Sequence, residues 1–207
     1  MKLILVCGPF GSGTTAIAGL LARLGATGFG PYVQVDDERT GNTYELAAFR
    51  EMLRACISEG TLAPLPGVDI KAELGKFRDR LVGGAFGPYD EKAGAPIFLK
   101  HPLAALVIPQ ICQTFETRIV YALRPLRDIE ATRQRRKWLE QYGAKGAGII
   151  YSHMFTALVD QTFPTVIVRY AQLIAAPLEH ARLLADFAGL KRKPEELKEA
   201  AAFVRGR

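Results

Sequence analysis

The sequence predicts an α/β fold with three layers, in which helices cover both faces of a central parallel sheet of four or five strands. Three observations lead to this fold class. Apolar runs of strand length alternate with segments of helical periodicity along the chain. A glycine-rich loop joins the first apolar run to the first helical segment. The chain has 207 residues, 49% of them hydrophobic, which is enough for the core of one domain over 1–207.

Four short apolar runs are predicted to form the strands of the sheet: 2–7, 97–100, 117–123 and 165–169. They are rich in Val, Ile and Leu, which is typical of strands that are buried on both faces. Since helical segments lie between them, the strands are expected to run parallel. Ligands of such folds bind at the carboxyl ends of the strands, so the residues that follow each strand are the candidates for function.

Helices are predicted wherever apolar residues recur at helical spacing between these strands. They cover 13–25, 44–58, 68–82, 103–112, 128–141, 146–161, 177–188 and 194–204. Residues 26–43 and 83–96 are rich in glycine and are expected to be loops, the first with a short extended piece at Val33–Val35. The charged run Asp36–Arg39 in the first loop fits both a contact to a substrate and simple turn chemistry.

The charge and cysteine content limit the function classes. The formal charge of +6 favours an anionic ligand, but basic and acidic residues are mixed, so no stripe for nucleic acid is evident. Three scattered cysteines without a C-x-x-C pair predict free thiols in a reducing compartment, and we expect a cytoplasmic protein. No apolar stretch reaches the length of a membrane span.

The loop after the first strand has the spacing of a phosphate-binding P-loop, G-x-x-x-x-G, and makes the fold one of P-loop type. Thr14 stands where nucleotide-hydrolysing families have the lysine that reaches the β- and γ-phosphates of ATP. Backbone N–H groups and a helix N-terminus are still offered to a phosphate. We therefore predict a cradle for a ligand other than an ordinary triphosphate, although a glycine-rich turn without a ligand is the simpler alternative. The predicted binding residues of the loop are Gly8, Gly11, Ser12, Gly13, Thr14 and Thr15.

Basic and titratable residues follow the other three strands. Lys100 and His101 come after the second strand, and Arg124 after the third. Arg124, Asp128 and Thr132 are spaced by four residues, so they are expected to share one helix face. Arg124 and the Thr132 hydroxyl are expected to bind the same phosphate, while Asp128 in the first turn complements the helix dipole and orients the arginine. His101 fits a base and an uninvolved residue at a helix start equally well.

Other charged residues have simpler explanations. Five cations in 127–137 are expected to form a solvated helix face: Arg127, Arg133, Arg135, Arg136 and Lys137. For Arg169 and Tyr170, which follow the fourth strand, we favour structural roles, with Tyr170 packing and Arg169 paired to an acid.

Four segments resemble the P-loop sulfotransferases that use the donor PAPS (3′-phosphoadenosine 5′-phosphosulfate), and among these the bacterial branch. The run GSGTTAIAGLLARLG at Gly11–Gly25 is similar to the family's 5′-phosphosulfate loop. Arg124-Pro-Leu-Arg-Asp128 with Thr132 resembles its 3′-phosphate motif, in which an arginine is followed eight residues later by serine. The segments 98–109 and 169–190 are similar to the family's K-x-H-x-P and R-Y-E-D-L…P…F-L-G-L segments. Together the matches span residues 3–190.

The resemblance implies transfer of a sulfuryl group from PAPS to a hydroxyl or amine of a small-molecule, glycan or lipid acceptor, with no metal required. It implies that the loop holds the 5′-phosphosulfate and that Arg124 and Thr132 hold the 3′-phosphate. Lys100 would supply charge on the sulfate, and His101 would be the base.

One departure from the family pattern matters most: Gly11 stands where the family has a cation that stabilises the leaving group. A non-catalytic binder of the 3′,5′-bisphosphate is therefore the alternative function. A small-molecule kinase is a further alternative, against which the missing lysine argues.

Overall fold

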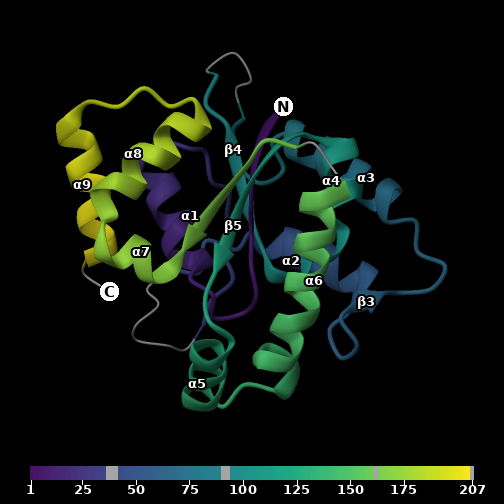
Figure 1. The fold of residues 1–207 in the computed structure, drawn as a ribbon. Coiled ribbons are helices and arrows are strands. Elements are labelled where there is room, and N and C mark those ends of the chain that lie inside the picture. Colours follow the sequence, from purple (N-terminus) through teal and green to yellow (C-terminus); the bar gives the residue numbers. More distant parts are fainter. Residues whose placement is uncertain (36–41, 90–93, 161–162, 206–207) are drawn as a thin grey trace.

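A computed structural model describes residues 1–35, 42–89, 94–160 and 163–205. It contains a parallel sheet of four strands in the order β4-β1-β5-β6, flanked by helices on both faces (Figure 1). The strands are β1 (Lys2–Cys7), β4 (Ile97–Lys100), β5 (Glu116–Leu123) and β6 (Thr165–Arg169). The predicted α/β class, the parallel sheet and the four strand positions are confirmed.

The central strand β1 pairs with β4 on one side and β5 on the other, so that Leu5 lies between Leu99 and Ile119. Its side chains alternate between two hydrophobic cores, one on each face of the sheet. This parallel register brings the carboxyl ends of all four strands to one edge of the sheet. The loop after β1, the residues after β4 and the residue after β5 therefore face a common space.

The helices form a layer on each face of the sheet (Figure 1). One layer consists of α1 (Thr14–Arg23), α7 (Tyr170–Ala175), α8 (Pro177–Ala188) and α9 (Pro194–Arg205). The other consists of α2 (Ala47–Cys56), α3 (Ile70–Val82), the 3₁₀ helix η2 (Pro102–Val107), α4 (Ile108–Thr114) and α6 (Ala144–Asp160). Helix α5 (Leu126–Arg136) and the 3₁₀ turn η3 (Glu140–Tyr142) lie beyond the carboxyl ends of the strands.

Some predicted helices differ in extent from the observed ones. The helix expected over 128–141 stops at Arg136, because Lys137 adopts a left-handed conformation with φ of 52°, which ends an α-helix. The helix expected over 103–112 begins as η2 and becomes α-helical only at Ile108.

Short elements were missed by the sequence analysis. The helix expected over 44–58 is shortened because Ile57–Ser58 (β2) pairs with Ala63–Pro64 (β3) in a small antiparallel hairpin. Helix α7 was not predicted either. The run Asp36–Arg39 lies outside the described residues.

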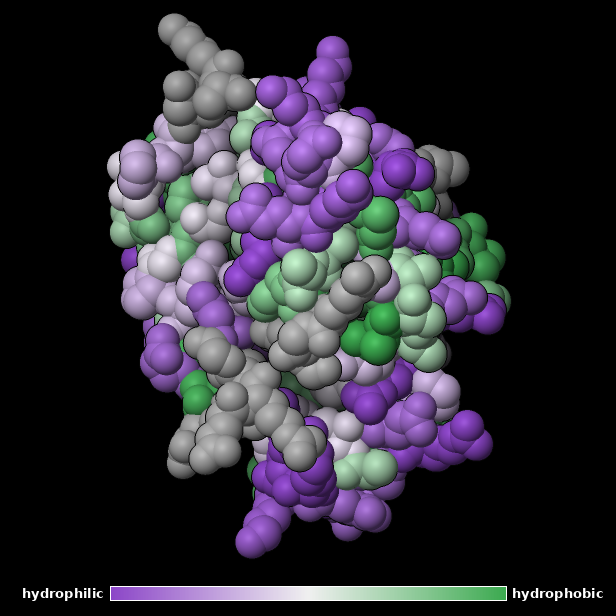
Figure 2. Space-filling view, turned by 90° about the vertical axis from the view of Figure 1, so that its left-hand side faces the viewer, coloured by the Kyte–Doolittle hydropathy of each residue, from purple (hydrophilic) through white to green (hydrophobic). Residues whose placement is uncertain are grey.

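The face made by α8 and α9 is mainly hydrophilic, with smaller apolar areas between the polar side chains (Figure 2). All three cysteines are free, as predicted, and Cys7 and Cys56 are buried. Across the described ranges, no helix combines the length and apolar character that crossing a membrane requires.

Candidate active site

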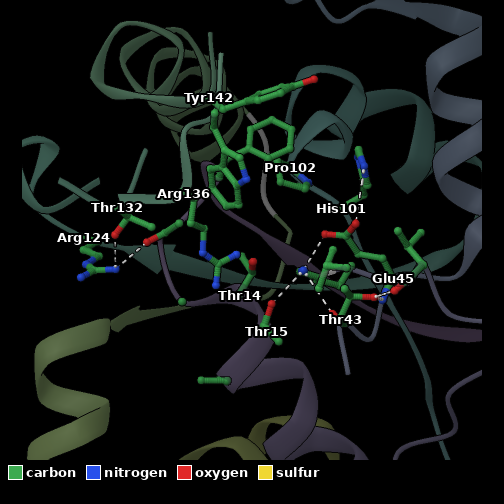
Figure 3. A pocket seen from close by; sticks show the side chains of 18 of the residues that line it. Thr14, Thr15, Thr43, Glu45, His101, Pro102, Arg124, Thr132, Arg136 and Tyr142 are labelled. Carbon is green, nitrogen blue, oxygen red and sulfur yellow. Dashed lines mark hydrogen bonds and ion pairs between the residues drawn. The ribbon is translucent and has the colours of Figure 1, made fainter. Parts of the chain in front are cut away.

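A cavity of about 720 Å³ lies at the carboxyl edge of the sheet, within the size range of small-molecule sites (Figure 3). The loop after β1, the end of β4, the start of the β5–α5 connection and the segment before α2 all contribute to its lining. Eight of the predicted site residues line this cavity: Gly11, Gly13, Thr14, Thr15, Lys100, His101, Arg124 and Thr132. The strand order thus brings together residues that are far apart in the sequence.

The loop after β1, which is the predicted phosphate cradle, has two glycines in the left-handed region of the backbone. Gly11 and Gly13 adopt φ of +75° and +99°, values that L side chains rarely take. The amides of Ala16 and Ile17 both donate to the Gly13 carbonyl and start helix α1. The amides of Thr14 and Thr15 precede this first helical hydrogen bond, so they are the donors that the helix N-terminus leaves for an anion.

Gly8 and Ser12, which were also predicted to bind the ligand, lie beneath this surface. A Cβ on Gly8 would come within 2.8 Å of the Ala122 carbonyl oxygen, so only glycine fits there. Ser12 is fully buried, and its hydroxyl has no hydrogen-bond partner among the described residues. These two residues shape the loop in this structure.

Arg124 connects the cradle to helix α5. Its Nη1 donates to the Gly11 carbonyl at 2.8 Å and to the Thr132 hydroxyl at 3.3 Å. Thr132 in turn donates to the Asp128 carbonyl at 2.9 Å. The guanidinium Nε of Arg124 is buried and has no hydrogen-bond partner among the described residues. The spacing argument for Arg124 and Thr132 therefore leads to two side chains in direct contact at the cavity.

The position of Arg124 is set from two sides. The Tyr151 hydroxyl on α6 accepts from the Arg124 amide and donates to the Arg124 carbonyl, both at 2.8 Å. The guanidinium lies 4.8 Å from the centroid of the Tyr170 ring, in a cation–π arrangement. Tyr170 also covers Gly13, where a Cβ would overlap its ring. The carboxylate of Asp128, which the sequence suggested as a group that orients Arg124, lies 3.6 Å from Arg127 instead.

Lys100 is buried and bonded to three acceptors. Its Nζ donates to the Glu45 carboxylate at 2.6 Å, to the Thr15 hydroxyl at 3.1 Å and to the Thr43 carbonyl at 3.2 Å (Figure 3). Burial opposes ionisation of Glu45, but Lys100 and His101 outweigh it and hold the pKa of this carboxyl below its ordinary value. The Thr15 hydroxyl accepts from a cation, which leaves its own proton for a ligand.

Glu45 is the functional candidate that the sequence analysis missed. Its position in the sequence fits the start of the helix predicted over 44–58, and no motif marks it. In the structure it precedes α2 in an extended segment, where its carbonyl accepts from the Val33 amide at 2.8 Å. That pairing turns the carboxylate toward Lys100.

His101 is buried beside this pair. Its Nδ1 accepts the Leu103 amide at 3.2 Å, which places the proton of the neutral ring on Nε2, 3.9 Å from the second carboxylate oxygen of Glu45. Burial lowers the pKa of His101 to about 4, because Glu45 only partly offsets the loss of water. The ring is therefore neutral at pH 7 and presents a donor to Glu45.

The last part of the lining consists of aromatic rings and two further cations. Phe10, Trp138 and Tyr142 line the cavity next to His101 and Pro102. Arg135 and Arg136, expected on a solvated helix face, line the cavity as well. Arg135 is exposed, in line with that expectation, but the expectation was wrong for Arg136, which is only partly exposed and lies 4.7 Å from the centroid of the Trp138 ring. Helix α5 turns this end toward the cradle. Figure 3 shows the Arg136 side chain extended into the cavity.

No protein-family model matches the sequence, and no curated protein is detectably similar to it. Among solved structures, the chain is similar to a sulfotransferase domain of the Synechococcus PCC 7002 olefin synthase, with a TM-score of 0.56 and 14% identity over 97% of this chain and 77% of that one. The chain has the sulfotransferase fold. Sulfotransferase STF9 from Mycobacterium avium gives a TM-score of 0.60 at 14% identity, over 98% of this chain and 66% of that one. The sulfotransferase domain of the curacin biosynthetic pathway gives 0.55 at 15% identity, over 96% and 77%.

The fold relationship expected from the four sequence segments is thus confirmed. Among the residues that the structure describes, no cluster of three or more His, Cys, Asp or Glu side chains could hold a metal ion.

Proposed function

We propose that this protein is a sulfotransferase that moves a sulfuryl group from PAPS to a hydroxyl or amine of an acceptor. The observation that carries the proposal is the meeting of two anion-binding groups at one cavity. The cradle amides of Thr14 and Thr15 form one, and the Arg124–Thr132 pair forms the other. A nucleotide with phosphates on both its 3′ and 5′ positions matches two such groups, whereas AMP matches one.

The residues fit the donor by their chemistry. The cradle would hold the 5′-phosphosulfate through the Thr14 and Thr15 amides and hydroxyls. Arg124, with a buried Nε that has no partner among the described residues, would hold the 3′-phosphate together with Thr132. When bound, PAPS supplies the sulfuryl group and leaves as the 3′,5′-bisphosphate.

The residues beside the cradle are assigned to orientation and proton transfer. Lys100 orients the Thr15 hydroxyl toward the ligand and stabilises the ionised Glu45. Of the two groups that could take the acceptor's proton, Glu45 is favoured over His101, since neutral His101 carries its proton on the nitrogen that faces Glu45. The variants Glu45→Gln and His101→Asn separate these assignments, because only loss of the true base abolishes transfer while the bisphosphate still binds.

Because Gly11 stands where the family has a cation, a non-catalytic binder of the bisphosphate is the alternative function. All three N–H donors of Lys100 have acceptors within the protein, so Lys100 acts on the sulfate mainly through Thr15. Arg136, which enters the cavity from α5, is then our candidate for the cation that Gly11 lacks. If no cation serves the leaving group, the protein is a non-catalytic binder of the bisphosphate. The free thiols fit a reducing compartment, and we propose the cytoplasm as its place of action.

Thermal-shift profiling tests the proposal. At equal concentrations, adenosine 3′,5′-bisphosphate is expected to raise the melting temperature far more than AMP. At a concentration 100 times its Kd, the bisphosphate should stabilise the folded protein by about 2.7 kcal/mol. Equal shifts for the two nucleotides would contradict the proposal, and preference for ATP with magnesium would favour a kinase. Tight binding of the bisphosphate without sulfate transfer to a broad panel of acceptors would favour the non-catalytic alternative.

A further inference from the structure

One side of helix α6 exposes large apolar side chains to solvent. Phe155 is 67% exposed, Val159 65% and Ile149 36%. Two small residues, Gly148 and Ser152, lie between them and are exposed as well. Because these five residues recur at helical spacing, they share one side of the helix, and the opposite side packs into the core. We call these five residues the α6 face.

The edge of the sheet adds a further apolar side chain on the same side of the molecule. Ile167 belongs to β6, the last strand of the sheet, and is 46% exposed. It is in register with Tyr121, so both side chains point to the same side of the sheet. Tyr121 packs in the core that α6 covers. Apolar side chains that gather on one side of a molecule, in contrast to scattered ones, mark an interaction surface.

Charges flank the α6 face at its two ends. Residues 146–159 contain no Asp, Glu, Lys or Arg, whereas Lys145 precedes this stretch and Asp160 follows it. Both side chains are exposed, and neither has an ion-pair partner among the described residues. A lipid surface favours a helix with many lysines and arginines beside its apolar side, which this stretch does not offer. One positive and one negative end instead complement a second α6 that runs in the opposite direction.

We propose that the α6 face is a dimer interface, on which α6 of a second copy of this chain packs in antiparallel order. Lys145 then lies opposite Asp160 of the second copy, and the two-fold axis, which passes next to Ser152, repeats this pair at the other end. A Cβ on Gly148 would meet no atom within 4 Å, so the space above this glycine is open to the Phe155 ring of the second copy. The inference does not depend on the proposed function, since no residue of the α6 face lines the described cavity.

Sedimentation equilibrium of the full chain tests the interface. The native protein is expected to shift from the mass of one chain to that of two as its concentration rises through the micromolar range. Phe155→Glu should weaken this association at least about tenfold, because it places a charge in the apolar part of both halves. Val82→Glu is the matched control, since Val82 is 54% exposed on α3, and it should leave the association unchanged. The mass of one chain at every concentration, or equal association of Phe155→Glu and the native protein, would overturn the proposal.

Exchange of the end charges tests the antiparallel order. Lys145→Glu and Asp160→Lys each place like charges opposite one another at both ends, so each variant alone should dimerise severalfold more weakly than the native protein. An equimolar mixture of the two should recover the association, because opposite charges then meet at both ends. A mixture as weak as its separate components would overturn the antiparallel pairing. Flotation with phosphatidylserine vesicles that Phe155→Glu abolishes, together with the mass of one chain in solution, would assign the α6 face to a lipid surface and overturn the dimer.

Discussion

Replacing Lys100 by methionine isolates the buried ion pair at the centre of the site. The substitution keeps the length of the side chain and removes the cation 2.6 Å from Glu45. The two side chains are 4% and 15% exposed, so water compensates little for the loss. Breaking a buried pair by removing one partner costs about 3–5 kcal/mol of stability, because an uncompensated charge is left behind. We expect the free energy of unfolding of Lys100→Met at pH 7 to be lower than that of the native protein by an amount in this range.

The loss is expected to depend on pH in a defined direction. In the native protein the pKa of Glu45 is below its ordinary value of 4.5, so its stabilising effect is present above that pH and disappears as the pH falls through the folded pKa. In Lys100→Met, burial becomes the dominant influence and raises this pKa, so the penalty is absent at low pH and grows as the pH rises. The difference between the two proteins should therefore narrow from pH 7 toward pH 4.5.

Urea unfolding at pH 7 and pH 5 measures the difference in stability between the two proteins, provided that both show the same slope of unfolding free energy against urea concentration. Lys71→Met, at an exposed lysine of α3, is the control for loss of a positive charge. The double variant Lys100→Met with Glu45→Gln should recover most of the stability, because no buried charge is left. A loss under about 1 kcal/mol, the range of surface pairs, or a loss independent of pH, would refute the reasoning.

Four further predictions concern other parts of the site. Arg124→Ala should weaken binding of the bisphosphate by about 1.5–3 kcal/mol and should hardly change the binding of AMP. Equal losses of affinity for the two nucleotides in calorimetric titrations would exclude Arg124 as the 3′-phosphate contact. Tyr151→Phe removes two hydrogen bonds to the Arg124 backbone and should lower the ratio of bisphosphate to AMP affinity, whereas a purely structural role would leave that ratio unchanged. Gly11→Arg should destabilise the protein by about 1–2 kcal/mol because of the positive φ, so a gain of transfer activity without loss in thermal unfolding would contradict the observed loop conformation. Stability should fall as the pH drops from 6.5 toward 4, since the unfolded chain protonates His101 before the folded one does, and His101→Asn should flatten this part of the pH profile of unfolding.

Local patterns in the sequence were sufficient to predict the strands, the glycine-rich turn into the first helix and the pairing of Arg124 with Thr132. A strand or a helix face depends mainly on residues within a few positions of one another, and such periodicity can be read directly. The parallel arrangement of the strands then implies that Lys100, His101 and Arg124 end at the same edge of the sheet. Their roles toward a ligand stay predictions.

The tertiary structure decided what depends on contacts between distant segments. Glu45 reaches Lys100, 55 positions further along the chain, only because the extended segment before α2 pairs with Val33. The left-handed turn at Lys137 ends α5, and the residues on both sides of it, Arg136 and Trp138, line the cavity. Pairing across long sequence separations and a strained turn are stabilised by the surrounding packing and leave no periodic signal. The ring contacts among Phe10, Trp138 and Tyr142 and the Glu45–Lys100 pair could therefore be found only in the folded chain.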